Sequence, residues 1–214
     1  MVKVFLSAGH GGNDPGAVSN GLYEKTINLN TLLACKSELE RHGLTVVCSR
    51  TKDENDPVTQ EVEEANVSGA DIAVSFHVNA GGGDGFEAYY YESSKSGKNL
   101  ASLCEKHVKA LGQNSRGLKS GNHLHFVKKT KMIAVLVESF FIDNQKDRAI
   151  GDVLAEQSAF GVAYAKAILE YFGITYKPVS NRKYRVQVGS YSKKTNAETM
   201  KQKLINAGFD AVIV

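Results

Sequence analysis

The stretch VKVFLSAGHGG, residues 2–12, decides the fold, because a short apolar run passes directly into a glycine-rich loop. Residues 2–8 are dominated by valine, phenylalanine and leucine, a composition that favours a buried strand. Glycines on both sides of His10 allow the backbone to come close to a ligand. We therefore predict a first strand that ends near residue 8 and carries His10 just beyond its carboxyl end.

Strand-like and helix-like segments alternate along most of the chain that follows. The apolar spacing predicts helices at residues 24–42, 98–111 and 145–172, the last with a break near Gly151. Another predicted helix follows the loop around Pro57 and ends at about residue 68. Short apolar runs predict strands at residues 44–49, 71–78, 86–92, 124–127 and 134–140. This alternation favours an α/β fold, with a mostly parallel twisted sheet and helices on both faces.

A polar segment with a proline, residues 174–183, follows the last long helix and has the composition of a linker. We predict a catalytic domain at residues 1–173 and a second module at residues 184–214. Within this module the pattern predicts a strand at 184–191, a helix at about 195–207 and a strand from 209 onward. Strand, helix and strand make only half of a small α+β domain, so we expect a partial module.

The charge is unevenly distributed. Residues 176–214 carry eight Lys or Arg against two Asp or Glu, a net +6, whereas the remainder carries −3. Such a basic tail suggests an anionic partner, and cell-wall polymer, nucleic acid and membrane all qualify at this point. The first residues do not resemble a signal peptide, and no apolar run approaches the length of a membrane span. We therefore expect synthesis in the cytoplasm.

Three cysteines, Cys35, Cys48 and Cys104, give an odd count without a CxxC pair. This pattern argues against a disulfide framework and against a thiolate zinc site. We interpret all three as small core residues.

Four polar residues stand where a core would not accept them without a partner. His77 ends an apolar strand, Glu138 lies inside AVLVESFF, Glu24 opens a helix, and His10 lies among glycines. Two histidines and one carboxylate are a typical ligand set of catalytic zinc, and a second carboxylate can act as general base. From the residues alone other roles stay open: a structural or surface histidine, a helix-start carboxylate at Glu24, and an ion pair at Glu138.

The order of several motifs narrows this choice. FLSAGHGGNDPGA (5–17), Glu24, ADIAVSFHVNA (70–80), NSRGLK (114–119) and AVLVESFFIDN (134–144) resemble the Amidase_3 family of N-acetylmuramoyl-L-alanine amidases. The resemblance covers about residues 2–172. It implies Zn²⁺ held by His10, Glu24 and His77, with Glu138 as the catalytic base. It also implies cleavage of the amide between N-acetylmuramic acid and L-alanine. A zinc peptidase of the stem peptide, or a wall-binding protein without activity, are the alternatives.

Three positions depart from the family pattern. Glu61 stands where an arginine is common, Phe76 replaces an isoleucine, and Phe140 replaces a glycine. These departures leave the shape of the substrate groove open.

Four further polar residues are secondary candidates. Asp14 is placed to hold His10 by a hydrogen bond, although Asp before Pro also favours a turn. Asn79 is placed to orient the loop after His77. His123 and His125 would share one face of a strand, which is either exposed or in contact with substrate.

The tail YRVQVGSYSKKTNAETMKQKLINAGFDAVIV, residues 184–214, resembles the first half of a SPOR domain. SPOR domains bind peptidoglycan glycan strands, so the resemblance implies peptidoglycan, rather than nucleic acid or membrane, as the partner. A wall substrate without a signal peptide is typical of a phage or prophage endolysin, which acts on the wall after release. A bacterial autolysin is the alternative.

Overall fold

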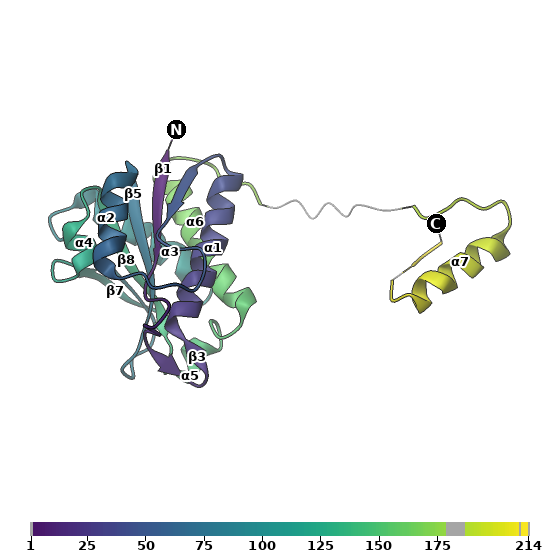
Figure 1. Ribbon diagram of the computed structural model, residues 1–214, viewed down its shortest axis with the longest axis horizontal. Helices are drawn as coiled ribbons and strands as arrows, with labels where there is room; N and C mark the ends of the chain where they lie inside the picture. The colour runs from purple at the N-terminus through teal and green to yellow at the C-terminus, as the bar shows by residue number, and fades with distance from the viewer. Residues whose placement is uncertain (1, 179–186, 210, 214) are drawn as a thin grey trace. The chain divides into compact units, whose positions relative to one another are not determined.

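The computed structural model describes residues 2–178, 187–209 and 211–213 (Figure 1). The chain divides into two compact units, with the boundary after Lys177. The first unit contains the sheet, and each unit is described by itself below.

A six-stranded sheet forms the centre of the first unit. Its strands, in spatial order, are β4 (Thr45–Cys48), β1 (Lys3–Ala8), β5 (Ile72–Asn79), β8 (Ile133–Phe141), β6 (Phe86–Tyr90) and β7 (Ser115–Ser120). All neighbouring strands are parallel except β6 and β8, which are antiparallel. The predicted α/β fold with a mostly parallel sheet is therefore confirmed.

Helices cover both faces of this sheet (Figure 1). One face packs against α1 (Glu24–Arg41), α3 (Lys95–Lys109) and α6 (Leu154–Tyr171), and the other against α2 (Val58–Ser68) and α4 (His125–Lys129). The side chains of β5 alternate accordingly: Val74 and Phe76 join the larger core cluster, and Ala73 joins the smaller one. His77 follows Phe76 and therefore projects to the face that carries α2 and α4.

The predicted break near Gly151 is present. A short helix, α5 (Gln145–Arg148), precedes α6, and its buried Asp147 accepts hydrogen bonds from the backbone N–H groups of Gly85 and Phe141, at 2.8 and 2.7 Å. These bonds fix the end of β8. Cys35 and Cys104 are buried as expected, Cys48 is partly buried, and all three are free thiols.

The predicted strand at residues 124–127 is wrong. His125 begins the helix α4, and the consecutive residues Phe126 and Val127 are both buried, which a strand with alternating faces would not allow. A run of four residues is too short for its periodicity to separate helix from strand. The edge strand β7 and a small hairpin, β2 (Val18–Ser19) with β3 (Leu22–Tyr23), were not predicted.

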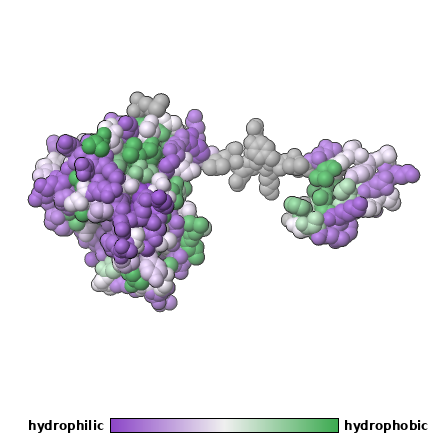
Figure 2. Space-filling view, viewed as in Figure 1, coloured by the Kyte–Doolittle hydropathy of each residue, from purple (hydrophilic) through white to green (hydrophobic). Residues whose placement is uncertain are grey.

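The second unit contains α7 (Lys194–Asn206), which agrees with the helix predicted there. None of the residues of α7 is buried. Residues 187–191, 209 and 211–213 are not assigned to a strand, and the rest of the two predicted strands lies outside the described residues. In the described part of the chain, no helix is both long and apolar enough to cross a membrane. Figure 2 shows that hydrophilic residues cover most of the visible surface of the first unit.

Candidate metal centre and active site

The strand order brings the predicted site residues to one edge of the sheet. β1, β5 and β8 are parallel neighbours, so their carboxyl ends lie together, and His10, His77 and Glu138 follow or end these strands. Glu24 is the first residue of α1. The ligand atoms of His10, Glu24 and His77 all lie within 4.8 Å of one another. The structure therefore brings together the three residues predicted as metal ligands.

The carboxylate of Glu24 is the centre of this group. Its Oε1 atom lies 3.0 Å from His77 Nδ1 and 3.2 Å from His10 Nε2. Its Oε2 atom accepts a hydrogen bond from the backbone N–H of Ala17 at 2.8 Å. Zinc binds His nitrogen and carboxylate oxygen at about 2.0–2.2 Å, and tetrahedral ligands at that radius stand roughly 3.3 Å apart. The donor set and its spacing thus fit a zinc ion.

Local backbone geometry makes this close approach possible. His10 has a left-handed φ of 66°, so the backbone leaves the extended conformation just after β1. A Cβ atom on Gly9 would lie 2.0 Å from the His77 ring, and one on Gly16 would lie 2.7 Å from Glu24 Oε2. Glycine is therefore required at both positions. Asp14 Oδ2 lies 2.8 Å from His10 Nδ1, which confirms the predicted hydrogen bond and leaves Nε2 facing Glu24.

Electrostatics favour positive charge at this group. Burial lowers the pKa of His10, but the hydrogen bonds to Glu24 and Asp14 outweigh it and raise the pKa to about 9. Burial likewise lowers the pKa of His77, and its hydrogen bond to Glu24 reverses the shift. Burial raises the pKa of Glu24, but its bonds to the two imidazoles bring it well below its usual range. A buried carboxylate that stabilises positive charge on its neighbours in this way is suited to bind a divalent metal ion.

Glu138 lies beside the group without being part of it. It pairs across the sheet with His77 on β5 and with Glu87 on β6, so the three side chains share one face. Its Oε2 atom is buried and has no hydrogen-bond partner among the described residues. Burial, together with the neighbouring carboxylates, raises the pKa of Glu138 to about 7. Such a carboxyl group is suited to taking up and releasing a proton near neutral pH.

The structure shows where the three departures from the family pattern lie. Phe76 and Phe140 face the core, against the rings of Tyr164 and Phe160, so neither of them lines the edge where the site lies. Glu61 is buried and accepts a hydrogen bond from Ser7 Oγ at 2.7 Å.

The secondary candidates Asn79, His123 and His125 have different outcomes. Asn79 Oδ1 accepts a hydrogen bond from the N–H of Ala80 at 2.9 Å, so it does orient the loop after His77. His123 lies in a turn with its ring 6.1 Å from that of Tyr89, and His125 is the first residue of α4. The two histidines therefore do not share a strand face.

Sequence reasoning missed two groups near the site. Arg50 is 2% exposed and donates to the carbonyl groups of Ala8 and Lys25, at 2.9 and 2.7 Å, next to the two ends that carry His10 and Glu24. The buried Glu87, with Tyr89 and two basic residues around it, lies next to Glu138. A carboxylate in a buried strand was the only sequence signal for Glu87, and no sequence signal identified Arg50.

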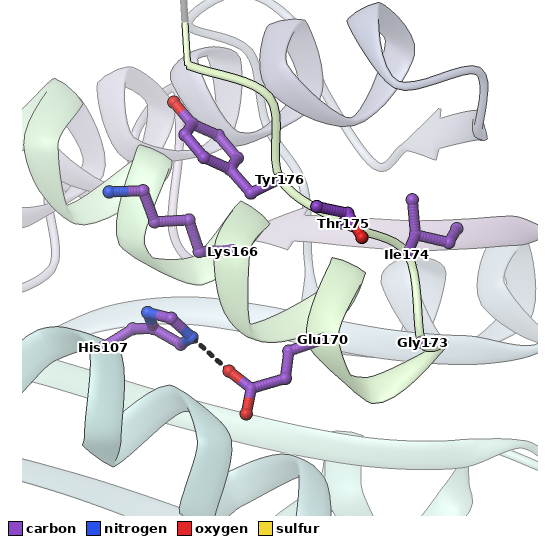
Figure 3. A pocket seen from close by; sticks show the side chains of 7 residues that line it. All are labelled: His107, Lys166, Glu170, Gly173, Ile174, Thr175 and Tyr176. Atoms are coloured by element: carbon purple, nitrogen blue, oxygen red, sulfur yellow. Dashed lines mark hydrogen bonds and ion pairs between the residues drawn. The ribbon is translucent and has the colours of Figure 1, made fainter.

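A separate pocket lies between α3, α6 and the segment that follows α6 (Figure 3). There Glu170 pairs with His107 at 2.7 Å, and Lys166 lies 4.9 Å from the centre of the Tyr176 ring. None of the four predicted site residues lines this pocket. It is therefore distinct from the group around Glu24.

Comparison with known proteins agrees with this geometry. Residues 4–170 match the Amidase_3 family, N-acetylmuramoyl-L-alanine amidase, and residues 180–214 match the SPOR domain. The N-acetylmuramoyl-L-alanine amidase CwlM of Bacillus licheniformis is 34% identical over 218 residues, which cover 100% of this chain and 85% of CwlM. The endolysin of Bacillus phage SPP1 is 40% identical over 176 residues, which cover 75% of this chain and 64% of the endolysin.

A solved structure gives the same result. The catalytic domain of CwlV, an N-acetylmuramoyl-L-alanine amidase from Bacillus (Paenibacillus) polymyxa var. colistinus, has a TM-score of 0.76 and 35% identity. The match covers 82% of this chain and 100% of that domain. The chain therefore belongs to the Amidase_3 family and is an N-acetylmuramoyl-L-alanine amidase, an enzyme that hydrolyses peptidoglycan.

Proposed function

We propose that this amidase is a zinc enzyme in which His10, Glu24 and His77 hold the metal and Glu138 is the general base. The observation that carries the proposal is the convergence of two imidazole nitrogens on the buried carboxylate of Glu24, with a second carboxyl group beside them. The bond cleaved is the amide between the lactyl group of N-acetylmuramic acid and L-alanine. Bound zinc would polarise that carbonyl group and lower the pKa of water to about 7.

The role of Glu138 follows from its position and its environment. Its enclosed Oε2 atom has no hydrogen-bond partner in the described part of the chain, so it is free to accept a proton from the attacking water. As the carbon–oxygen bond forms and the carbon–nitrogen bond breaks, Glu138 passes a proton to the leaving amine of L-alanine. A pKa raised by burial to about 7 supports both steps in one carboxyl group.

The Glu138→Gln variant tests this assignment. It keeps the size of the side chain and removes the proton-accepting oxygen, so we expect kcat to fall by about 10²-fold to 10⁴-fold. Zinc content, measured by elemental analysis, should stay at the wild-type value. In contrast, His77→Ala should lose both zinc and activity. Full activity in Glu138→Gln would refute the assignment of Glu138 as the general base. A wild-type enzyme that is active without zinc would refute the proposal that zinc is the catalytic metal.

Product analysis separates the possible reactions. An amidase releases a peptide with a new amino-terminal L-alanine and leaves the lactyl group on muramic acid. A peptidase of the stem peptide would instead leave L-alanine attached to muramic acid, and a binding protein without activity would release nothing.

We further propose that the enzyme is made in the cytoplasm and acts on the cell wall after release, as an endolysin or as an autolysin. The similarity to a phage endolysin and to the amidase CwlM supports either setting. The match to the SPOR domain supports peptidoglycan as the partner of the second unit.

A further inference from the structure

Two basic side chains stand beside the site on the same face of the sheet. Arg116 and Lys119 of β7, which we call the β7 cation pair, both donate to Glu87 Oε1, at 2.6 and 2.5 Å. The other oxygen of Glu87, Oε2, accepts hydrogen bonds from the hydroxyl of Tyr89 at 2.7 Å and from Asn79 Nδ2 at 3.2 Å. Glu87 is 2% exposed. One buried carboxylate therefore anchors two cations, and the cluster keeps a surplus of positive charge.

The β7 cation pair is held in place but remains open to solvent. The side chains of Arg116 and Lys119 are 42% and 36% exposed. The guanidinium group of Arg116 lies over the ring of Phe141 at 5.3 Å, and only its Nε atom has a hydrogen-bond partner among the described residues. Its two terminal nitrogens are thus available. This fork is the part of arginine that binds a carboxylate through two parallel hydrogen bonds.

The sheet register sets the distance from the catalytic centre. Glu138 pairs with Glu87 across β8 and β6, and Tyr89 pairs with Lys119 across β6 and β7. Neighbouring strands are about 4.8 Å apart, so β7 lies roughly 10 Å from β8. An extended peptide advances by about 3.3–3.6 Å per residue. With the cut amide near Glu138, the long side chains of the pair reach the first residues of the stem peptide.

We propose that the β7 cation pair is a subsite for a free carboxylate of the stem peptide, on the residue that follows the released L-alanine. The proposal rests on the function proposed above, because it takes the scissile amide to lie beside Glu138. Pairing of this carboxylate with Arg116 and Lys119 orients the leaving peptide, and it makes the enzyme prefer substrates in which that carboxylate is not amidated.

Two soluble substrates that differ by one group test the proposal. They are N-acetylmuramoyl-L-Ala-D-Glu and its D-isoglutamine counterpart, in which an amide replaces the α-carboxylate. We expect kcat/KM of the wild-type enzyme to be at least about tenfold higher for the carboxylate, a factor that corresponds to about 1.4 kcal/mol. In Arg116→Ala and Lys119→Ala this ratio should fall toward one. Because both substrates meet the same variant, any general damage to folding or to Glu138 cancels in the ratio.

Lys36→Ala is the matched control. Lys36 is also a partly exposed cation paired with a carboxylate, Glu40, and lies about 18 Å along α1 from Glu24. Its variant should keep the wild-type ratio. Equal rates of the wild-type enzyme on both substrates, or an unchanged ratio in both β7 variants, would overturn the subsite.

Binding of the two peptides L-Ala-D-Glu and L-Ala-D-isoglutamine, measured by titration, makes the test independent of catalysis. Preference for the carboxylate without any cleavage would refute the proposed function and leave the subsite standing. Cleavage at the amide without a preference in rate or in binding would refute the subsite alone.

Discussion

A hydrogen bond to Asp14 helps to orient the ring of His10. Asp14 Oδ2 lies 2.8 Å from His10 Nδ1, which directs Nε2 toward Glu24. Loss of such a partner typically costs 10-fold to 100-fold in metal affinity, so we expect Asp14→Ala to bind zinc about 10-fold to 100-fold more weakly. Competition with a chromophoric chelator measures this affinity directly.

Asp14→Asn is the informative companion, since its amide oxygen can still accept from Nδ1 and should retain most of the affinity. If Asp14→Ala held zinc as tightly as the wild type, the glycine-rich loop alone would orient His10.

The identities of the site residues could be predicted from sequence, but their contacts could not. His10, Glu24 and His77 are side-chain types that bind zinc, at positions where the chain pattern places strand ends and a helix start. No pattern revealed that Gly9 must lack a side chain because the His77 ring occupies that space. For Glu87 the only sequence signal was a carboxylate in a buried strand, and its partners Arg116 and Lys119 lie on a strand that the sequence did not predict.

The packing of α1 against α6 depends on one glycine. A Cβ atom at Gly161 would lie 2.3 Å from the backbone oxygen of Thr31 and 2.7 Å from Ala34 Cβ. In an exposed helix, Gly→Ala stabilises by about 0.8–1.0 kcal/mol. Here we expect Gly161→Ala to lower the free energy of unfolding by about 1–3 kcal/mol, because the two helices must separate. Urea denaturation measures the change.

Ser37→Ala, at an exposed position of α1, is the control and should change the free energy of unfolding by about 0.5 kcal/mol or less. A Gly161→Ala variant more stable than the wild type would mean that helix propensity outweighs the contact between α1 and α6.

At the scale of elements, prediction succeeded where periodicity was long and failed where it was short. The α1 pattern spans 18 residues, and the buried strands β5 and β8 are almost continuously apolar. By contrast, β7 (SRGLKS) is a polar edge strand with a register shift against β6, and it lacks both alternation and an apolar run. The prediction for the residues of the short helix α4 was wrong for the same reason.

The two units of the whole molecule differ in charge and in packing. The second unit, residues 178–214, holds seven Lys or Arg against two Asp or Glu, a net +5, whereas the first unit holds nineteen against twenty-one, a net −2. α7 has no buried residue, whereas the first unit has a core on each face of its sheet. Catalytic chemistry therefore belongs to the first unit, and we expect the second unit to contribute through its charged surface.

Charge reversal in the full-length chain tests this division of roles. The variant replaces three exposed lysines of the tail by glutamate: Lys193, Lys194 and Lys203. Each reversal changes the charge by two, so the net charge of the tail, residues 176–214, falls from +6 to zero. We expect binding to purified peptidoglycan sacculi at low salt to weaken by about tenfold or more, and its dependence on salt to diminish. Hydrolysis of a small soluble muropeptide should remain at the wild-type rate, since the catalytic group is untouched.

A control with the same change in total charge separates a local effect from a general one. It replaces three exposed lysines of α3 by glutamate: Lys95, Lys98 and Lys109. If the tail binds the wall, this control should bind sacculi more tightly than the tail variant, because net charge alone attracts both proteins equally. Equal losses in the two variants would show that attraction to the wall is a property of total charge and would remove the specific role of the tail.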